Sequence, residues 1–277
     1  MYAPCVRLFS ALAWLGLVLA SAACGTTNEE QPPAHDAGIE DASATDASTT
    51  EDVGVPDAGS DGPPLTGFCN TQSPKPAFCD DFDDDDVDDD WTILTQSNGI
   101  GALNETSATS TPASFTVQTA ELVKDQTANV HLRASMKGKP TRIRFAFNAQ
   151  FSEVSFTDGA IAYATLDVSS THYFTLYLRD QDPDAPATTL EEINGATTNR
   201  YVLPKTPLKA TWTRIVLDVD LAAGSATVSY NNEKVFETSA IVKTPSDEPT
   251  IRLGAVYTFG PFPEWEGRFD DVVVSFP

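Results

Sequence analysis

Basic residues are scarce in this 277-residue chain, in which 17 Lys and Arg stand against 40 Asp and Glu. The formal net charge of −23 would repel a phosphate backbone, so the composition argues against a nucleic-acid partner. Ten acids lie in residues 25–67 and nine in residues 80–90, which leaves residues 91–277 with 21 acids and 15 Lys and Arg. That last region has a net charge of −6, which is ordinary for a soluble domain.

Sequence motifs of catalysis are also missing. The chain has no Gly-x-Ser-x-Gly elbow, no His-Glu-x-x-His motif, no phosphate-binding loop and no strand with suitably spaced carboxylates. Of three His, His35 lies in a polar stretch, whereas His131 and His172 each begin an expected strand, where histidine is usually a satisfied surface group. We therefore predict no catalytic residue; a degrading enzyme with an unrecognised site is the alternative.

The N-terminus is typical of an export signal. Residues 8–22 are apolar, follow Arg7 and are too few for a membrane span of about 20 residues, and small residues then lead into Cys24. We expect residues 1–23 to be a signal peptide and Cys24 to be the lipidated first residue of an outer-membrane lipoprotein, held in the membrane by its lipid alone. Ser21 stands where lipoprotein signals usually have Leu or Val, so a soluble secreted protein is the alternative.

Residues 24–67 are expected to be a disordered tether. After Cys24 they contain no Lys or Arg and almost no large apolar side chains, and Asp, Ala, Ser, Thr, Gly and Pro dominate. Such a composition cannot bury enough apolar surface to offset the entropy of the chain. We interpret it as an acidic spacer between the lipid anchor and a folded domain.

Residues 68–277 are expected to form one all-β domain. Apolar and polar residues alternate in short runs that Gly, Pro, Asn and Asp separate, and no long segment has a helical stripe. This pattern favours an antiparallel sandwich or jelly roll. The expected strands are Ser114–Ala120, Val130–Met136, Arg142–Phe151, Ala160–Val168, Tyr173–Arg179, Thr213–Val219, Ala226–Tyr230, Lys234–Thr238, Thr250–Phe259 and Phe269–Phe276.

Two cysteines of this domain, Cys69 and Cys79, are expected to form a disulfide. Export would place them in an oxidising compartment, and they flank a short loop that contains proline. A metal or redox role is the minor alternative, because two cysteines ten residues apart match no zinc spacing.

Three stretches of sequence carry a family resemblance. They are Phe78-Cys79-Asp80-Asp81-Phe82 followed by Trp91; Trp212–Tyr230 with the turn Asn231-Asn232; and Ile251-Arg252-Leu253-Gly254 followed by Gly267–Val274. In their order and spacing they resemble concanavalin A-like lectin/glucanase domains of the laminin-G-like type. The resemblance implies a jelly-roll sandwich of two curved antiparallel sheets, with the first and last strands adjacent.

A calcium site is the second implication of the resemblance. Such sandwiches often hold a structural Ca²⁺ where the terminal strands meet, which makes Asp81 or Asp83 with Asp270 or Asp271 the candidate ligands. Carboxylate oxygens suit Ca²⁺, although the run 80–90 lacks the glycine and closing glutamate of an EF-hand. The alternative is a solvated acidic loop without a metal.

Alternation within the strands predicts a polar sheet face that could bind a sugar. Aromatic and hydrogen-bonding side chains would share that face, as on the concave ligand face of lectins and carbohydrate-binding modules. An aromatic loop adds a further candidate, Trp265. Equally, Tyr and Thr are good strand residues that need no ligand. The predicted ligand-binding residues are Tyr163, Asp167, Tyr173, Tyr177, Arg179, Arg144, Asn148 and Trp265.

Together these features predict a cell-envelope lipoprotein that displays a non-catalytic β-sandwich. Its expected partner is a glycan or another envelope surface component. Two alternatives stay open: a polysaccharide hydrolase or lyase of the same fold, and a structural or adhesion protein that binds another envelope protein.

Overall fold

The computed structural model describes residues 67–84, 87, 90–156, 159–179, 188–261 and 263–277. The predicted signal peptide, the lipidated Cys24 and all of the predicted tether except Gly67 lie outside these residues. In the described part of the chain, no helix is long and apolar enough to cross a membrane.

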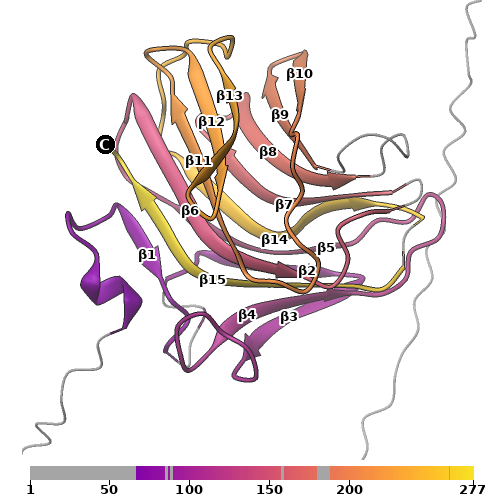
Figure 1. Cartoon of the computed structure of the whole chain (residues 1–277). Coiled ribbons are helices and arrows are strands. Elements are labelled where there is room, and N and C mark those ends of the chain that lie inside the picture. Colours follow the sequence, from indigo (N-terminus) through magenta and orange to yellow (C-terminus); the bar gives the residue numbers. More distant parts are fainter. Residues whose placement is uncertain (1–66, 85–86, 88–89, 157–158, 180–187, 262) are drawn as a thin grey trace, which may run out of the picture. The chain divides into compact units, whose positions relative to one another are not determined.

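Two antiparallel sheets pack face to face in a jelly-roll sandwich, as predicted (Figure 1). The described residues contain one short helical element, the 3₁₀ turn η1 (Phe68–Thr71). Sheet A has the strand order β13 (Glu233–Thr238), β12 (Ser225–Tyr230), β11 (Thr213–Asp220), β6 (Arg142–Phe151), β15 (Trp265–Ser275), β4 (Ser114–Thr119) and β3 (Gly99–Asn104), with β1 (Phe78–Asp80) also paired to β15. Sheet B has the order β10 (Thr197–Val202), β9 (Thr188–Asn194), β8 (His172–Arg179), β7 (Ala160–Asp167), β14 (Thr250–Phe259), β5 (Asn129–Ser135) and β2 (Ile93–Ser97).

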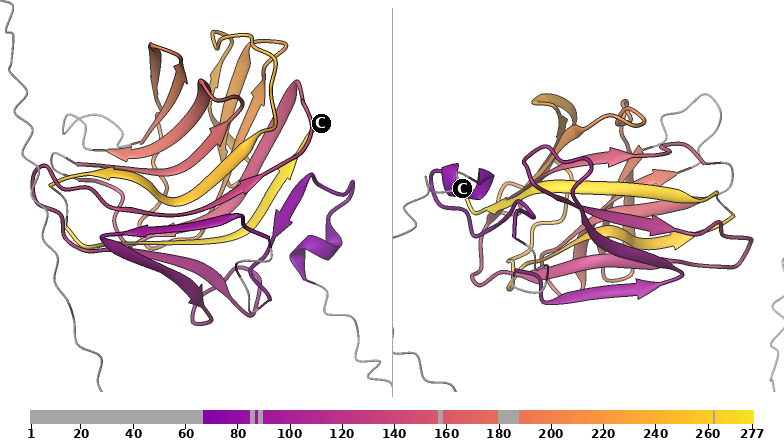
Figure 2. Two further views of the ribbon diagram at one scale, coloured as in Figure 1. Left: turned by 180° about the vertical axis from the view of Figure 1, so that it is seen from behind. Right: turned by 90° about the horizontal axis from the view of Figure 1, so that it is seen from below.

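The first and last strands lie side by side. Cys79 of β1 is opposite Val273 of β15, and both ends of the domain meet at one margin of sheet A (Figure 2). The predicted disulfide between Cys69 and Cys79 is present, and it joins η1 to β1. Just beyond β1, Phe82 stacks on Trp91 and is buried. The expected closure of the sandwich by its terminal segments is therefore confirmed.

Alternating aromatic and aliphatic residues of the facing strands build the core. On β6, Phe145, Phe147 and Phe151 are fully buried, and Phe174 and Leu176 of β8 are buried in the same cluster. Burying each such side chain contributes roughly 1.5–3 kcal/mol, so two facing stripes are enough to hold the sheets together. The opposite faces of the strands are left for polar residues.

Five strands had no counterpart among those expected from alternation: β1, which only the family resemblance had indicated, and β2, β3, β9 and β10. Three of them, β2, β3 and β10, are edge strands of their sheets. Edge strands are half exposed and here are short and rich in Gly, Thr, Asn or Ser, so their apolar alternation is weak. The turn at Asn231-Asn232 is confirmed: both residues have positive φ (49° and 67°), as a two-residue hairpin turn requires, and Asn tolerates that conformation.

Candidate functional site

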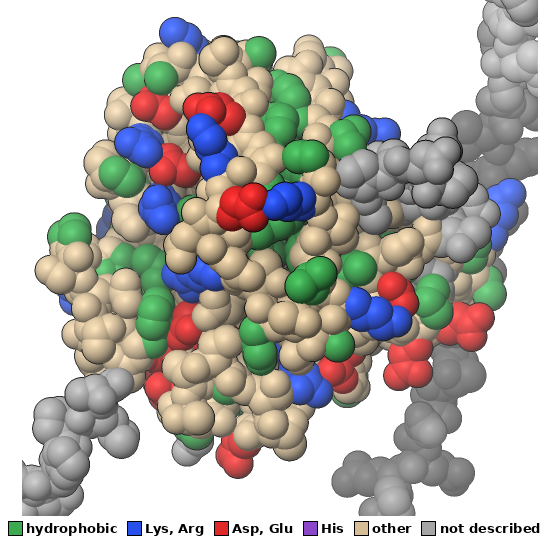
Figure 3. Space-filling view, viewed as in Figure 1, with side chains coloured by type: hydrophobic (Ala, Val, Ile, Leu, Met, Phe, Trp, Pro, Cys, Tyr) green, Lys and Arg blue, Asp and Glu red, His purple; other side chains and the backbone are tan. Residues whose placement is uncertain are grey.

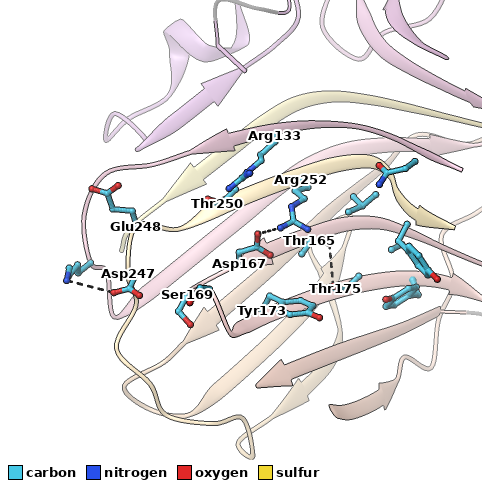
Figure 4. A pocket seen from close by; sticks show the side chains of 17 residues that line it. Arg133, Thr165, Asp167, Ser169, Tyr173, Thr175, Asp247, Glu248, Thr250 and Arg252 are labelled. Carbon is cyan, nitrogen blue, oxygen red and sulfur yellow. Dashed lines mark hydrogen bonds and ion pairs between the residues drawn. The ribbon is translucent and has the colours of Figure 1, made fainter. Parts of the chain in front are cut away.

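The outer face of sheet B, on the side away from the core, is hollowed into a groove of about 1100 Å³. Side chains from β5, β14, β7 and β8 line it, and Thr165 and Thr175 lie on its floor (Figure 4). The strand register places one polar row across the sheet. From β5 to β10 that row reads Arg133, Arg252, Thr165, Thr175, Glu191 and Arg200.

Three tyrosines stand along the groove: Tyr173, Tyr177 and Tyr257. Tyr257 is half exposed, and Ala162 of β7 separates it from Tyr177 in the strand register. Burial and then the nearby Glu191 carboxylate raise the pKa of Tyr177 to about 12, so its phenol keeps its proton at neutral pH. The groove therefore offers aromatic surface together with hydrogen-bond donors. Of the predicted ligand residues, Tyr173, Tyr177 and Asp167 come together here.

Arg179 lies beside the groove rather than in its lining. Its guanidinium carbon is 4.2 Å from the centre of the Tyr177 ring, and its Nη2 donates to Glu191 Oε1 at 2.8 Å. Arg200 Nε donates to the same oxygen at 2.7 Å. The charge of Arg179 is thus matched by Glu191, and the guanidinium holds Tyr177 in place.

Two arginines lie directly opposite each other on adjacent strands, Arg133 on β5 and Arg252 on β14. Arg252 Nη2 donates to Asp167 Oδ2 at 2.6 Å (Figure 4). Arg133 makes no side-chain hydrogen bond or ion pair with another described residue, and its Nε is buried without a partner. The floor of the groove therefore holds one unmatched cation.

His131 occupies the same side of β5, two residues from both Asn129 and Arg133. It is only 8% exposed, and its Nδ1 is 2.5 Å from Asn129 Oδ1. Burial and then the charges of Arg252 and Arg133 lower the pKa of His131 to about 4, so the ring is neutral at pH 7. The expectation of a surface histidine is wrong for His131, because β5 begins at Asn129 and His131 is its third residue. It is also wrong for His172, which is 1% exposed and whose Nε2 lies 3.0 Å from Glu192 Oε1.

Tyr163 does not reach the groove, contrary to prediction. The pairing of β7 with β8 shifts between Ala162 and Ala164, so the bulged Tyr163 and its neighbour Ala164 both lie in the core. The Tyr163 ring packs 5.0 Å from that of Phe151 and is fully buried. Strict alternation counted through the bulge placed it on the wrong face.

Trp265 is also a core residue, and its predicted contact with a ligand is wrong. Its ring stacks on Phe151 at 5.8 Å and has no exposed surface. Its Nε1 donates to the Glu153 carbonyl oxygen at 3.0 Å, which satisfies the indole without solvent.

Arg144 and Asn148 belong to the other sheet. Alternation on β6 was predicted correctly, but β6 pairs with β11 and β15 in sheet A, so these side chains do not face the groove. Arg144 lies 3.8 Å from Asp218, and Asn148 Nδ2 donates to Asp271 Oδ2 at 2.6 Å. Strand alternation alone does not say which sheet a strand joins.

An acidic cluster lies at the margin of sheet A where β1 and β15 meet, built from Asp81, Asp83, Asp270 and Asp271. Asp270 is fully buried and accepts from the backbone N–H of Thr109 at 2.6 Å and of Ser110 at 3.0 Å. Burial and then the Asp271 charge raise the pKa of Asp270 to about 6. Burial and then the charge of Asp81, followed by those of Asp270 and Asp271, raise the pKa of Asp83 to about 6.

The chemistry of this cluster fits a hard cation. Asp83 Oδ1 and Asp271 Oδ1 are both buried without a hydrogen-bond partner, and carboxylate oxygens of this kind are the ligands that Ca²⁺ prefers. Among the described residues, however, no three His, Cys, Asp or Glu side chains already converge as metal ligands. The cluster therefore contains suitable ligand oxygens, but its described side chains are not arranged as a complete coordination site. Asp85, Asp86, Asp88 and Asp89 of the acidic run lie outside the described residues.

No family model matches the chain, and no curated protein matches it. Among solved structures, it is similar to an endo-β-1,4-glucuronan lyase from the fungus Trichoderma reesei, at 12% identity over 73% of this chain and 96% of that one, with a TM-score of 0.55. It is also similar to the cellulose induced protein Cip1, at 11% identity over 70% of this chain and 96% of that one, with a TM-score of 0.50. At such identities the likeness shows the fold, a jelly-roll sandwich of two antiparallel sheets.

Proposed function

We propose that the protein binds a glycan chain along the groove of sheet B. The observation that carries the proposal is the line of Tyr173, Tyr177 and Tyr257 beside Thr165, Thr175 and Asp167 in one open groove. Aromatic faces accept the C–H surface of a sugar, and the neighbouring hydroxyls and carboxylate meet its hydroxyl groups.

The proposal includes display at the cell envelope. It rests on the sequence of residues 1–67: a signal peptide, a lipid on Cys24 and an acidic spacer, in an outer-membrane lipoprotein. Mass spectrometry of the N-terminal peptide of the mature protein tests this part. An acylated Cys24 supports anchoring, whereas an unmodified N-terminus near Cys24 supports the alternative of a soluble secreted protein.

Retention of the full chain on a panel of polysaccharides tests the binding. We expect Tyr177→Ala to weaken binding about tenfold, because a lost stacking contact is worth roughly 1 kcal/mol or more. Ile100→Ala is the matched control, since Ile100 is an exposed apolar residue of β3 in sheet A. Equal binding by Tyr177→Ala would contradict the proposal. No retention by any polysaccharide, together with capture of an envelope protein, would support the adhesion alternative.

A second candidate function is cleavage of the bound glycan, favoured by His131. A neutral imidazole can accept a proton, and Arg133 and Arg252 lie where they would stabilise negative charge that develops nearby. Size analysis of each bound polysaccharide after long incubation separates the two functions. If the polysaccharide becomes shorter, and His131→Gln abolishes the shortening while it retains binding, cleavage is established. If the polysaccharide chains keep their length, the protein binds the glycan without cleaving it.

We also propose that the acidic cluster binds a structural Ca²⁺. Asp83, Asp270 and Asp271, with Asp81 beside them, would hold it, and the ion would neutralise carboxylates that otherwise repel one another. Its support is the pair of unpartnered buried oxygens, Asp83 Oδ1 and Asp271 Oδ1.

A further inference from the structure

We infer that the glycan is acidic and that a carboxylate of its sugar units binds to Arg133, beside Arg252, on the floor of the groove. The inference rests on the proposed function and names the substrate class of the same site. Arg133 is one of the residues that line the groove, and the carboxylate would bind to the part of its side chain that faces the groove.

The pairing of the other arginines makes Arg133 exceptional. Among the described arginines, Arg142, Arg144, Arg179, Arg200, Arg252 and Arg268 each lie within 4 Å of a carboxylate. Arg214 donates from Nη1 to the Asp271 carbonyl oxygen at 2.6 Å. Only Arg133, within the described residues, has neither kind of partner. Its Nε is buried without a partner, as is that of Arg179, but the guanidinium of Arg179 is bonded to Glu191.

Within the described residues, the carboxylates of the groove form no ion pair with Arg133. Asp167 accepts from Arg252, and its charge interacts with both Arg252 and Arg133, so one carboxylate is shared by two guanidinium groups. Asp247 pairs with Lys139 at 3.8 Å, and Figure 4 shows Asp247 and Glu248 well apart from Arg133. The protein therefore places two guanidinium groups and one carboxylate in the floor, with neutral His131 beside them.

Cross-strand geometry strengthens the argument. Like charges directly opposite on adjacent strands destabilise a sheet, yet Arg133 and Arg252 occupy that arrangement. A planar carboxylate is the natural partner of a guanidinium, and a carboxylate bound to Arg133 would offset the repulsion between Arg133 and Arg252. Tyr173 and Tyr177 on the same face would contact the ring that carries it. Uronic acid units combine a carboxylate with such a ring.

Calorimetric titration of the full chain tests the inference. The probes are oligomers of β-1,4-glucuronate and of galacturonate, their carboxyl-reduced neutral counterparts, and a sulfated neutral glycan. We expect at least one uronate oligomer to bind about tenfold or more tightly than its reduced counterpart, as charge-assisted hydrogen bonds are strong. Arg133→Gln should lose that advantage and leave binding of the reduced oligomer unchanged.

Arg144→Gln is the matched control, because Arg144 is a half-exposed arginine on sheet A. Its uronate binding should equal that of the unaltered protein. Equal affinity for acidic and reduced oligomers, or unchanged uronate binding by Arg133→Gln, would overturn the inference while the proposed function stood. Arg133-dependent binding of the sulfated glycan alone would overturn the carboxylate assignment. If no oligomer binds, acidic or neutral, the inference fails, and the proposed function fails too only if the panel of polysaccharides is also not retained.

Discussion

The groove of sheet B and the acidic cluster of sheet A depart from charge pairing in opposite directions. On the groove floor, Arg133 lies opposite Arg252 on the adjacent strand. The carboxylate of Asp167 accepts from Arg252. The acidic cluster gathers carboxylates around Asp270 and leaves Asp83 Oδ1 and Asp271 Oδ1 without partners. Each excess calls for an ion of the other sign, so the comparison indicates an anionic ligand in one place and a cation in the other.

Elsewhere the described residues show how this protein treats charge when no ligand is involved. Arg142 donates two hydrogen bonds of 2.8 Å to Asp218, and buried His172 lies 3.0 Å from Glu192. Glu192 also accepts from the Val242 N–H at 2.6 Å and so holds the chain after β13 against sheet B. On the face in Figure 3, basic and acidic side chains are interspersed rather than gathered by sign. In these examples, charge that is buried or half buried has a partner of opposite sign.

Calcium should produce the largest stability change, and only through the acidic cluster. At a thousandfold excess over its Kd, Ca²⁺ would stabilise the folded chain by about 4 kcal/mol and raise Tm by roughly 10 °C. Scanning calorimetry with Ca²⁺, with Mg²⁺ and with a chelator measures the shift. Asp83→Asn should remove most of it, because an amide cannot replace the carboxylate charge.

Asp247→Asn is the control for calcium, since Asp247 lines the groove of sheet B and is not part of the acidic cluster. Its calcium response should match that of the unaltered protein. A Tm that does not respond to millimolar Ca²⁺ would refute cation binding by the acidic cluster, and it would not bear on ligand binding in the groove.

Removing the disulfide should destabilise the domain by about 2–3 kcal/mol, since the bridge closes a loop between residues 69 and 79. It should also weaken calcium binding, because Cys69 N donates to Asp81 Oδ2 at 2.9 Å and places that carboxylate. Denaturant unfolding and calcium titration of Cys69→Ser/Cys79→Ser measure the two effects. Glycan affinity should stay the same; its loss would mean that the two regions are not independent.

The burial of His131, and then the charges of Arg252 and Arg133, should appear as a pH dependence of stability. The folded-state pKa of His131 is about 4, below its ordinary value of 6.5, so the unfolded chain binds the proton more tightly. The stabilising contribution of neutral His131 is full above pH 6.5 and is lost as the pH falls toward 4, up to about 3 kcal/mol.

Relative to the unaltered protein, His131→Gln should gain stability as the pH falls from 6.5 toward 4, because it has no imidazole to protonate and the raised pKa values of Asp83 and Asp270 affect both proteins alike. Urea unfolding of both proteins at several pH values measures the difference. A bound uronate should raise the pKa of His131, because its charge offsets those of Arg133 and Arg252. Proton NMR of the imidazole with and without the acidic oligomer checks this. An unchanged titration curve in the saturated complex would place the carboxylate elsewhere.

Local patterns in the sequence were enough to predict the sandwich. Strands β6 and β14 begin and end at the predicted residues, because each is long and has an apolar residue at alternate positions. The disulfide was predicted from the two cysteines of the folded domain, Cys69 and Cys79. The pairing of β1 with β15, implied by the family resemblance, also brought the predicted acidic residues together.

The site was harder to predict because bulges and sheet membership decide it. Tyr163 turns into the core at a bulge whose position depends on packing between the sheets, which no alternation rule contains. For Arg144, the face of its strand was predicted correctly, but the strand belongs to sheet A and not to sheet B. Sheet membership depends on pairing between strands that are far apart in the chain. His131 was set aside as a strand-end residue, although its two-residue spacing from Asn129 and Arg133 was a readable signal.

The smallest predicted effect is the sharpest test of the comparison between unpaired and paired charge. Arg142→Gln removes a guanidinium that is bonded to Asp218, and we expect it to destabilise the domain by up to about 1 kcal/mol. Arg133→Gln removes one that has no partner and faces Arg252, so the free energy of unfolding should stay constant or rise by a few tenths of a kcal/mol. Urea unfolding of both variants without ligand measures the difference. A groove arginine whose loss costs binding but not stability is kept for its ligand, whereas a clear destabilisation by Arg133→Gln would show that its charge serves the fold.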